Sequence, residues 1–139
     1  MSEERVELAP IGWVESSLDD LAKAPKQGDE GAPDAWLVIR VDLLEGLGGI
    51  EVGDELLVLT WLHRARRGVL EVHPRGDAMR SPQGVFSTRS PDRPNPIGLH
   101  RVEVAEVEGS RLRVHRLEAV NGTPILDLKP VLSADVGER

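Results

Sequence analysis

The 139-residue sequence has no cysteine, no tyrosine, one phenylalanine and three tryptophans. The absence of cysteine excludes disulfide bonds, thiolate metal sites and cysteine nucleophiles together. With so few aromatic residues, the core must consist mainly of valine, leucine and isoleucine. No apolar run approaches the roughly 20 residues that cross a bilayer, and the N-terminal stretch MSEERVELAPIG lacks the basic and apolar segments of a signal peptide. These absences predict a cytoplasmic enzyme or binding module.

Negative charge dominates the chain, but its distribution is uneven. The net charge of −7 argues against a generally basic nucleic-acid binder. Between Trp61 and Arg101, however, eight arginines stand against three acidic residues, and the remaining segments are strongly acidic. This segregation indicates either an anion-binding site or arginines scattered over the surface, and composition alone does not choose between them.

The hydrophobic pattern predicts an all-β fold in a single domain covering residues 1–139, either a small barrel or a sandwich. Two near-continuous apolar runs predict strands buried on both faces, at residues 35–41 and 55–62. Alternating patterns predict a strand at residues 68–73 and a hairpin at residues 101–120 that turns at Gly109-Ser110. A short last strand is expected at residues 125–128, and one helical turn within residues 42–54. The polar stretch 16–34 is either disordered or a functional loop.

Several common motifs are absent. The glycine cluster at residues 46–49 lacks the third glycine of a dinucleotide fingerprint, and no P-loop signature occurs. The serines do not lie in a nucleophile elbow. No metal site is predicted, because the four histidines lack close metal-ligand spacing; they are His63, His73, His100 and His115.

The stretch 86-FSTRSPDRPNPIGLHRVEV-104 is the most informative part of the chain. Its three prolines fix φ and push the preceding residues toward extended backbone, so the segment cannot be a helix. Arg89 and Arg93 carry planar donor groups suited to carboxylates or phosphates, and Asn95 adds a donor and an acceptor. These residues predict a rigid, cationic, anion-binding loop rather than a plain surface turn with solvated arginines.

This stretch resembles the signature of the TsaA-like/TrmO family of S-adenosylmethionine-dependent methyltransferases. Further segments resemble the family in the same order, so that the resemblance covers about residues 8–136; they are PIGWVESS, Pro25-Lys26-Gln27, EGLGGIEVGDELLVLTWLH and NGTPILDLKP. The resemblance implies a β-barrel of about six to seven mainly antiparallel strands with one short helical turn. It also implies a homodimer that binds S-adenosylmethionine near the subunit interface and methylates N6-threonylcarbamoyladenosine 37 of a threonine tRNA.

The family's cofactor-binding positions carry over onto ten residues, namely Pro25, Lys26, Gln27, His63, Arg64, Arg89, Leu99, Val120, Asn121 and Gly122. On this reading Arg89 clamps a carboxylate of the cofactor or of the substrate. Arg93 and Asn95 orient the urea-like acceptor group. Asp127 either takes the acceptor's proton or accepts an N–H at a strand end.

The sequence departs from the family at three points. Lys26 replaces an arginine, and Val131 replaces the aromatic residue that usually follows Lys-Pro. The extra C-terminal domain of the better-known bacterial members is not expected, because the sequence ends at Arg139 soon after the barrel. Two alternatives therefore stay open: the same barrel methylating a small molecule, and a non-catalytic module that binds S-adenosylmethionine.

Overall fold

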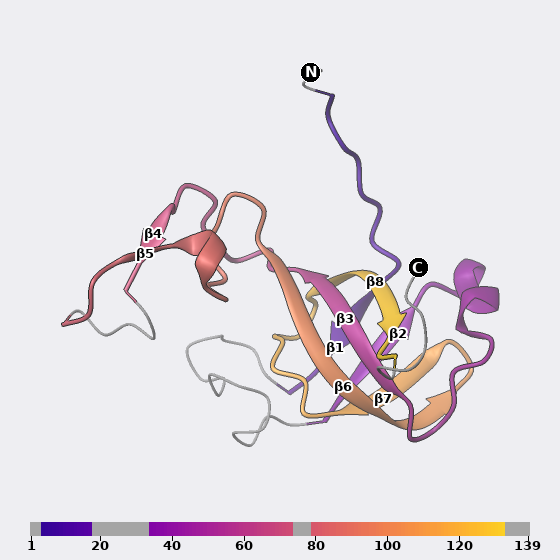
Figure 1. The fold of residues 1–139 in the computed structure, drawn as a ribbon. Coiled ribbons are helices and arrows are strands. Elements are labelled where there is room, and N and C mark those ends of the chain that lie inside the picture. The colour runs from indigo at the N-terminus through magenta and orange to yellow at the C-terminus, as the bar shows by residue number, and fades with distance from the viewer. Residues whose placement is uncertain (1–3, 18–33, 74–78, 133–139) are drawn as a thin grey trace.

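Six antiparallel strands form a closed barrel in the computed structural model, which describes residues 4–17, 34–73 and 79–132. Around the barrel the strands are β1 (Gly12–Glu15), β2 (Ala35–Ile39), β7 (Arg111–His115), β6 (Ile97–Glu108), β3 (Glu55–Trp61) and β8 (Pro124–Pro130) (Figure 1). Pairing of Gly12 with Ile125 and of Trp13 with Pro124 joins β1 to β8 and closes the ring. The predicted all-β barrel is confirmed.

The barrel interior is an apolar core supplied by alternate residues of the six barrel strands and by Leu117 and Ala119, which lie between β7 and β8. Thirteen buried side chains form it: Val14, Ala35, Leu37, Ile39, Leu56, Val58, Val102, Val104, Leu112, Val114, Leu117, Ala119 and Ile125. In β2 and β3 the outward residues are only partly buried, so the prediction of strands buried on both faces is wrong. In this barrel the outer face is partly covered by neighbouring side chains, as where the Arg111 guanidinium lies 4.6 Å from the Trp36 ring.

Other elements follow the sequence pattern less closely. The helical turn expected within residues 42–54 is the 3-10 helix η3 (Val41–Leu47). The hairpin between β6 and β7 is confirmed, with Gly109 at φ 60° in its turn. The strand predicted at residues 68–73 is reduced to β4 (Glu71–Val72), which pairs with β5 (Gln83–Gly84) outside the barrel, and the 3-10 turn η5 (Val85–Ser87) follows.

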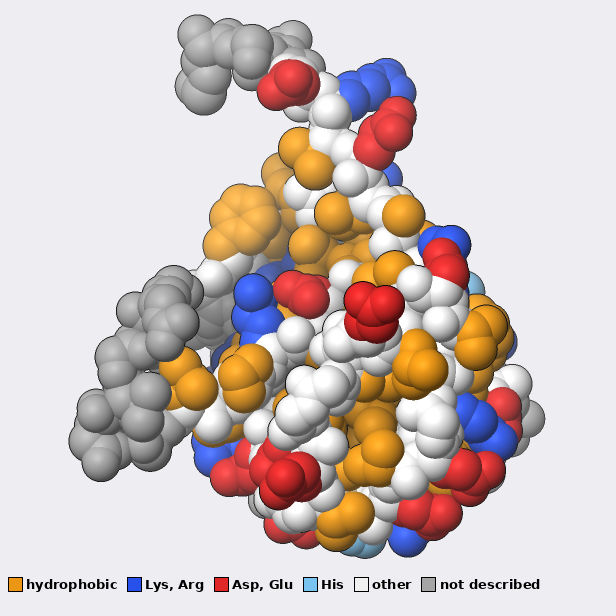
Figure 2. All heavy atoms as spheres, turned by 90° about the vertical axis from the view of Figure 1, so that its right-hand side faces the viewer, with side chains coloured by type: hydrophobic (Ala, Val, Ile, Leu, Met, Phe, Trp, Pro, Cys, Tyr) orange, Lys and Arg blue, Asp and Glu red, His pale blue; other side chains and the backbone are white. Residues whose placement is uncertain are grey.

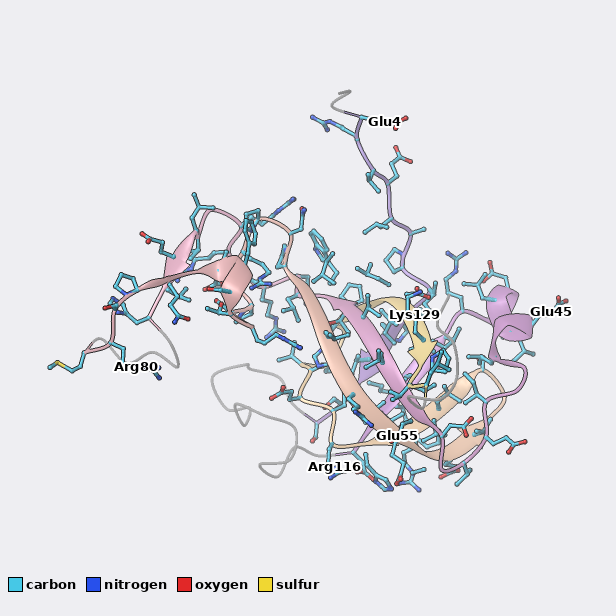
Figure 3. All side chains as sticks on the ribbon, in the orientation of Figure 1. Glu4, Glu45, Glu55, Arg80, Arg116 and Lys129 are labelled. Carbon is cyan, nitrogen blue, oxygen red and sulfur yellow. The ribbon has the colours of Figure 1, made fainter. Side chains whose placement is uncertain are left out.

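The two ends of the barrel differ. Because the strands are antiparallel, β1, β3 and β7 end where β2, β6 and β8 begin. From this end, which we call the arm end, residues 62–73 and 79–96 project as an arm carrying β4, β5 and η5 (Figure 1). The helix η3 lies at the other side of the barrel, and Figure 2 shows acidic and apolar side chains interspersed on that face. Figure 3 places Arg80 far out on the arm and Glu45 on η3.

A small polar group interrupts the apolar interior near the arm end. The Thr60 hydroxyl and His100 Nε2 lie 2.8 Å apart, and a β-carbon added to Gly98 would lie only 2.4 Å from the Thr60 Oγ1. Only glycine fits at position 98, because Thr60 and His100 fill the adjacent space. Burial of the imidazole lowers the pKa of His100 to about 4, so this histidine is neutral at physiological pH.

Candidate functional site

Two segments of the arm run side by side next to the barrel. Residues 62–67 leave the end of β3, and residues 92–96 lead into β6. The Leu62 N–H donates to the Pro96 carbonyl at 2.8 Å, and the Arg93 N–H donates to the Arg66 carbonyl at 3.1 Å. The Arg66 N–H donates to Asp92 Oδ1 at 2.8 Å. The proline-rich loop is therefore tied by hydrogen bonds to the chain that follows β3.

Arg67 makes the second connection between these segments. Its Nε donates to the Pro94 carbonyl at 2.7 Å, and its Nη2 donates to Asn95 Oδ1 at 2.9 Å. Its guanidinium carbon lies 5.3 Å from the centroid of the Trp61 ring, within the range of a cation–π contact. Arg67 thus fixes Pro94 and Asn95 relative to the last residue of β3.

Arg93 holds the loop from within. Its Nη2 donates to the Val85 carbonyl and, at 2.6 Å, to the Thr88 carbonyl, so one guanidinium spans the turn η5. Its Nε is buried and lacks a hydrogen-bond partner in the part of the chain that the structure describes. These contacts fix the backbone immediately before Arg89. The side chain predicted to orient the substrate is therefore largely occupied in fixing the loop.

Arg89 and Asn95 differ from Arg93 because they face outward. Both side chains are exposed, and Arg89 forms no hydrogen bond or ion pair with any residue in the described ranges. Asn95 Oδ1 is occupied by Arg67, but its Nδ2 donates to none of the described residues. Phe86, the only phenylalanine, is 80% exposed close by in the sequence. The loop thus presents a cation, an amide donor and an apolar surface to solvent.

Leu99 and Asp127 lie on the outer face of the barrel. Leu99 of β6 pairs with Leu59 of β3, which pairs with Asp127 of β8, so the three occupy one cross-strand row. Strand spacing puts Leu99 and Asp127 about 10 Å apart. Asp127 Oδ1 accepts the Leu128 N–H at 2.9 Å, and its Oδ2 lies 3.4 Å from Lys129 Nζ. Asp127 thus accepts an N–H, as one alternative expected, but it lies in the middle of β8 and not at a strand end. Its role as a proton acceptor stays a prediction.

The turn before β8 reaches the arm end as well. The Ser16 N–H donates to Asn121 Oδ1 at 3.0 Å, and the Gly122 N–H donates to the Val14 carbonyl at 2.7 Å. Gly122 has φ 86°, a conformation that favours glycine. Val120 is buried beneath this turn. The predicted cofactor residues 120–122 are therefore held against the end of β1.

His63 and Arg64 lie two and three residues after the end of β3, and both are exposed at the arm end of the barrel. The predicted triplet Pro25-Lys26-Gln27 lies outside the described residues.

Sequence reasoning missed the role of Arg67 and of Asp92. The run 63-HRARR-67 signalled a basic cluster, but its carbonyl, carboxylate and amide partners lie more than twenty residues away in the sequence.

A surface hollow lies between η3 and β8, away from the loops just described. Apolar side chains at its base include Ile11, Ile39 and Leu56, and Asp127 is the one predicted site residue that lines it. Among the described residues, no three or more His, Cys, Asp or Glu side chains are grouped as metal ligands. No helix in the described ranges is long and apolar enough to cross a membrane. The candidate site is therefore the arm end, where the other predicted residues gather.

The groups at the arm end fit a ligand that carries a carboxylate and a flat or apolar portion. Arg89, which has no partner among the residues that the structure describes, offers its guanidinium for a carboxylate, and Asn95 offers an N–H donor. Leu99 is 45% exposed and supplies apolar surface at the start of β6. S-adenosylmethionine has these features, so the residues present are compatible with it.

Comparisons with known proteins agree with this fit. Residues 13–135 match the family model described as the tRNA-methyltransferase O N-terminal domain. A probable S-adenosyl-L-methionine-binding protein of Methanothermobacter thermautotrophicus is 42% identical over 130 residues, covering 94% of this chain and 93% of the relative. An S-adenosyl-L-methionine-binding protein of Archaeoglobus fulgidus is 43% identical over 122 residues, covering 88% and 86% respectively.

The fold also matches a solved structure. The crystal structure of TrmO from Pseudomonas aeruginosa superimposes with a TM-score of 0.75 at 28% sequence identity. The match covers 98% of this chain and 62% of the TrmO chain, so this chain spans less than two thirds of that protein.

Proposed function

This chain belongs to the tRNA-methyltransferase O N-terminal domain family, and from that membership we propose that it is an S-adenosylmethionine-dependent methyltransferase. The observation that supports the proposal most directly is that the described cofactor-loop residues belong to the loops of the arm end. Among them, Arg89 has no partner in the described part of the chain, and the amide of Asn95 is exposed on the same loop. For the acceptor we propose N6 of N6-threonylcarbamoyladenosine 37 in a threonine tRNA. The cytoplasmic location and the absence of a metal requirement stay predictions from the sequence.

The roles of the chain's own residues follow from their contacts. Bound S-adenosylmethionine supplies a methyl group already activated by its sulfonium, so the protein chiefly needs to position and desolvate the reactants. Arg89 binds a carboxylate through its planar donor fork. Arg93 sets the position of Arg89 by holding the Val85 and Thr88 carbonyls. Asn95 orients a bound reactant through its side-chain amide. Asp127 takes the acceptor's proton. For this transfer the substrate must extend along the outer face of the barrel, over the cross-strand row formed by Leu99, Leu59 and Asp127.

A homodimer is part of the same proposal. The outer face of β6 exposes Ile97 (40%) and Leu99 (45%) beside the partly buried Leu59 and Trp61 of β3. A second barrel packed on this apolar surface would complete the site next to Leu99. Light scattering after size-exclusion chromatography should give twice the monomer mass, and Ile97→Asp should give the monomer. A wild-type monomer at micromolar concentration would remove the dimer from the proposal.

The decisive experiment is methyl transfer from labelled S-adenosylmethionine to tRNA from cells that lack the modification, followed by nucleoside mass analysis. We expect a methylated threonylcarbamoyladenosine from wild type, and a loss of about tenfold to a hundredfold in Arg89→Met, because a charged hydrogen bond contributes about 1.5–3 kcal/mol. Arg80→Met is the matched control for cofactor affinity, since Arg80 is also exposed but lies far out on the arm (Figure 3).

Other outcomes would identify the alternatives. Binding of S-adenosylmethionine without methyl transfer to total tRNA or to cell extract would favour a binding module, the property named for the archaeal relatives. Methyl transfer to a small molecule alone would favour the second alternative. The salt dependence of RNA binding separates the substrate classes, because phosphate contacts give a steep slope.

A further inference from the structure

The contacts of Arg67 determine which chemical group Asn95 presents to a ligand. We propose that Arg67 is a positioning residue that makes Asn95 a hydrogen-bond donor, and not an acceptor, toward a carbonyl or carboxylate oxygen bound at the arm end. This inference rests on the proposed function and deepens it, because it assigns the chemistry of the ligand group that Asn95 recognises.

An asparagine amide has two different ends. Its oxygen accepts and its NH2 group donates, and a half-turn of the amide exchanges them. At this position Asn95 Oδ1 accepts from Arg67 Nη2 at 2.9 Å. A guanidinium has donors only, so the flipped amide would bring the NH2 group against N–H groups of Arg67. One orientation of Asn95 is therefore selected.

Arg67 is itself fixed by two further contacts. Its Nε donates to the Pro94 carbonyl at 2.7 Å, and its guanidinium lies over the Trp61 ring. Pro94 precedes Asn95, and Trp61 is the last residue of β3. Through these contacts, Arg67 fixes the orientation of the Asn95 amide relative to the end of β3, although the Arg67 side chain is exposed.

The ligand chemistry follows from the free end of the amide. The Asn95 residue is exposed and its Nδ2 donates to none of the described residues, so the complementary group must carry a lone pair. A donor whose own oxygen already accepts from a cation is polarised and favours a carbonyl or carboxylate oxygen, especially one that gains negative charge. Two sources have this chemistry: the carboxylate of S-adenosylmethionine and the ureido carbonyl of the acceptor.

Side-chain amide NMR tests the proposal directly, because the chain has only two asparagines, Asn95 and Asn121. With 15N-labelled asparagine, we expect the Asn95 NH2 signals to shift on adding either S-adenosylmethionine or an anticodon stem-loop that carries threonylcarbamoyladenosine. The ligand that produces the shift identifies the source of the oxygen. In Arg67→Met, addition of the ligand should no longer shift the Asn95 NH2 signals, or should broaden them. Unmoved Asn95 signals with both ligands would overturn the proposal.

Matched variants separate donation from structure. Asn95→Asp keeps an oxygen that accepts from Arg67 but replaces the free donor with an acceptor. We expect its Tm to stay within about 2 °C of wild type, while the affinity for the responding ligand falls about tenfold, the equivalent of one lost hydrogen bond. Wild-type affinity in Asn95→Asp would overturn the proposal.

A double-mutant cycle assigns the effect of Arg67 to Asn95. If Arg67 acts through the amide, Arg67→Met should cost affinity in the wild-type background and nothing further in Asn95→Asp. Arg67→Lys should restore part of the affinity, because lysine still donates to the asparagine oxygen. Fully additive losses would show that Arg67 acts independently and would contradict the proposal. These measurements need no methyl transfer, so the proposed reaction and this inference can fail separately.

Discussion

The barrel and the arm are held together by different interactions. Thirteen buried apolar side chains fill the barrel, whereas the described parts of the arm bury Val85 and Pro96 and rely on hydrogen bonds from arginines to backbone carbonyls. Apolar burial contributes in proportion to area and is insensitive to small shifts, whereas guanidinium contacts fix atoms at defined positions. The barrel therefore supplies stability, and the arm supplies the placement of functional groups.

The largest expected effect on stability is in the barrel. Leu37 is fully buried, so Leu37→Ala removes apolar contacts and leaves a cavity at the centre of the core. We expect the free energy of unfolding to fall by about 3 kcal/mol in urea denaturation. Leu44→Ala, on the 46%-exposed Leu44 of η3, should change it by less than about 0.5 kcal/mol. Equal losses in the two variants would show that the barrel core does not dominate stability.

The second effect is the pH dependence of the barrel. Burial lowers the pKa of His100 to about 4, below the ordinary value near 6.5 that applies in the unfolded chain. Neutral His100 therefore favours the fold above pH 6.5, and this contribution disappears as the pH falls toward 4, because the unfolded state then binds the extra proton. We expect wild type to lose up to about 3 kcal/mol more than His100→Gln between pH 7 and pH 4. If the free energy of unfolding falls equally with pH in wild type and in His100→Gln, His100 does not cause the pH dependence.

A smaller loss of stability is expected within the arm. Arg93→Met removes the hydrogen bonds to the Val85 and Thr88 carbonyls while keeping much of the side-chain volume. The free energy of unfolding should fall by about 1 kcal/mol, but calorimetry should show weaker binding of S-adenosylmethionine, because the backbone before Arg89 is released. Arg93→Lys should not restore binding, since one ammonium lacks the planar fork that spans the turn. Unaltered binding of S-adenosylmethionine in Arg93→Met would show that the hydrogen bonds of the arm do not place the ligand-binding groups.

The smallest stability effect is expected at the proposed ligand contact. Arg89 has no hydrogen bond or ion pair among the described residues, so Arg89→Met should leave the free energy of unfolding within about 0.5 kcal/mol of wild type. Thermal denaturation measures this in the same samples used for binding. A marked loss of stability would mean that Arg89 belongs to the framework of the arm, as Arg93 does.

The sequence predicted the barrel better than the arm for a physical reason. Alternating apolar residues along β6 and β7 report directly on which face enters the core, and Gly109-Ser110 marks the turn between them. The strand expected at residues 68–73 is reduced to Glu71 and Val72 because this segment belongs to the arm, where Leu70 is 63% exposed. In the described part of the arm only Val85 and Pro96 are buried, so there is little apolar contact to support a longer strand.

The site was predicted by residue type but not by role. Arg89 and Arg93 look equivalent in the sequence, since both are arginines next to proline-rich turns. In the structure they differ because Arg93 donates to the backbone carbonyls of Val85 and Thr88. Every residue has a backbone carbonyl, so the sequence does not indicate which ones will accept a hydrogen bond. The partnership of Arg67 with Asn95 escaped for the same reason: it depends on the pairing of two distant segments beside β3 and β6.

The seam between β1 and β8 has a consequence for how the chain reaches its fold. These strands join residues near opposite ends of the barrel sequence, Gly12 with Ile125. Loop closure over such a separation is entropically costly, and contacts of this kind slow folding in β-proteins. During synthesis the ring cannot close until β8 has left the ribosome, because β8 pairs with both β1 and β3. Until then, the edges of β1 and β3 that pair with β8 have no hydrogen-bonded neighbour. A short hairpin such as β6–β7 is the natural place for ordering to begin.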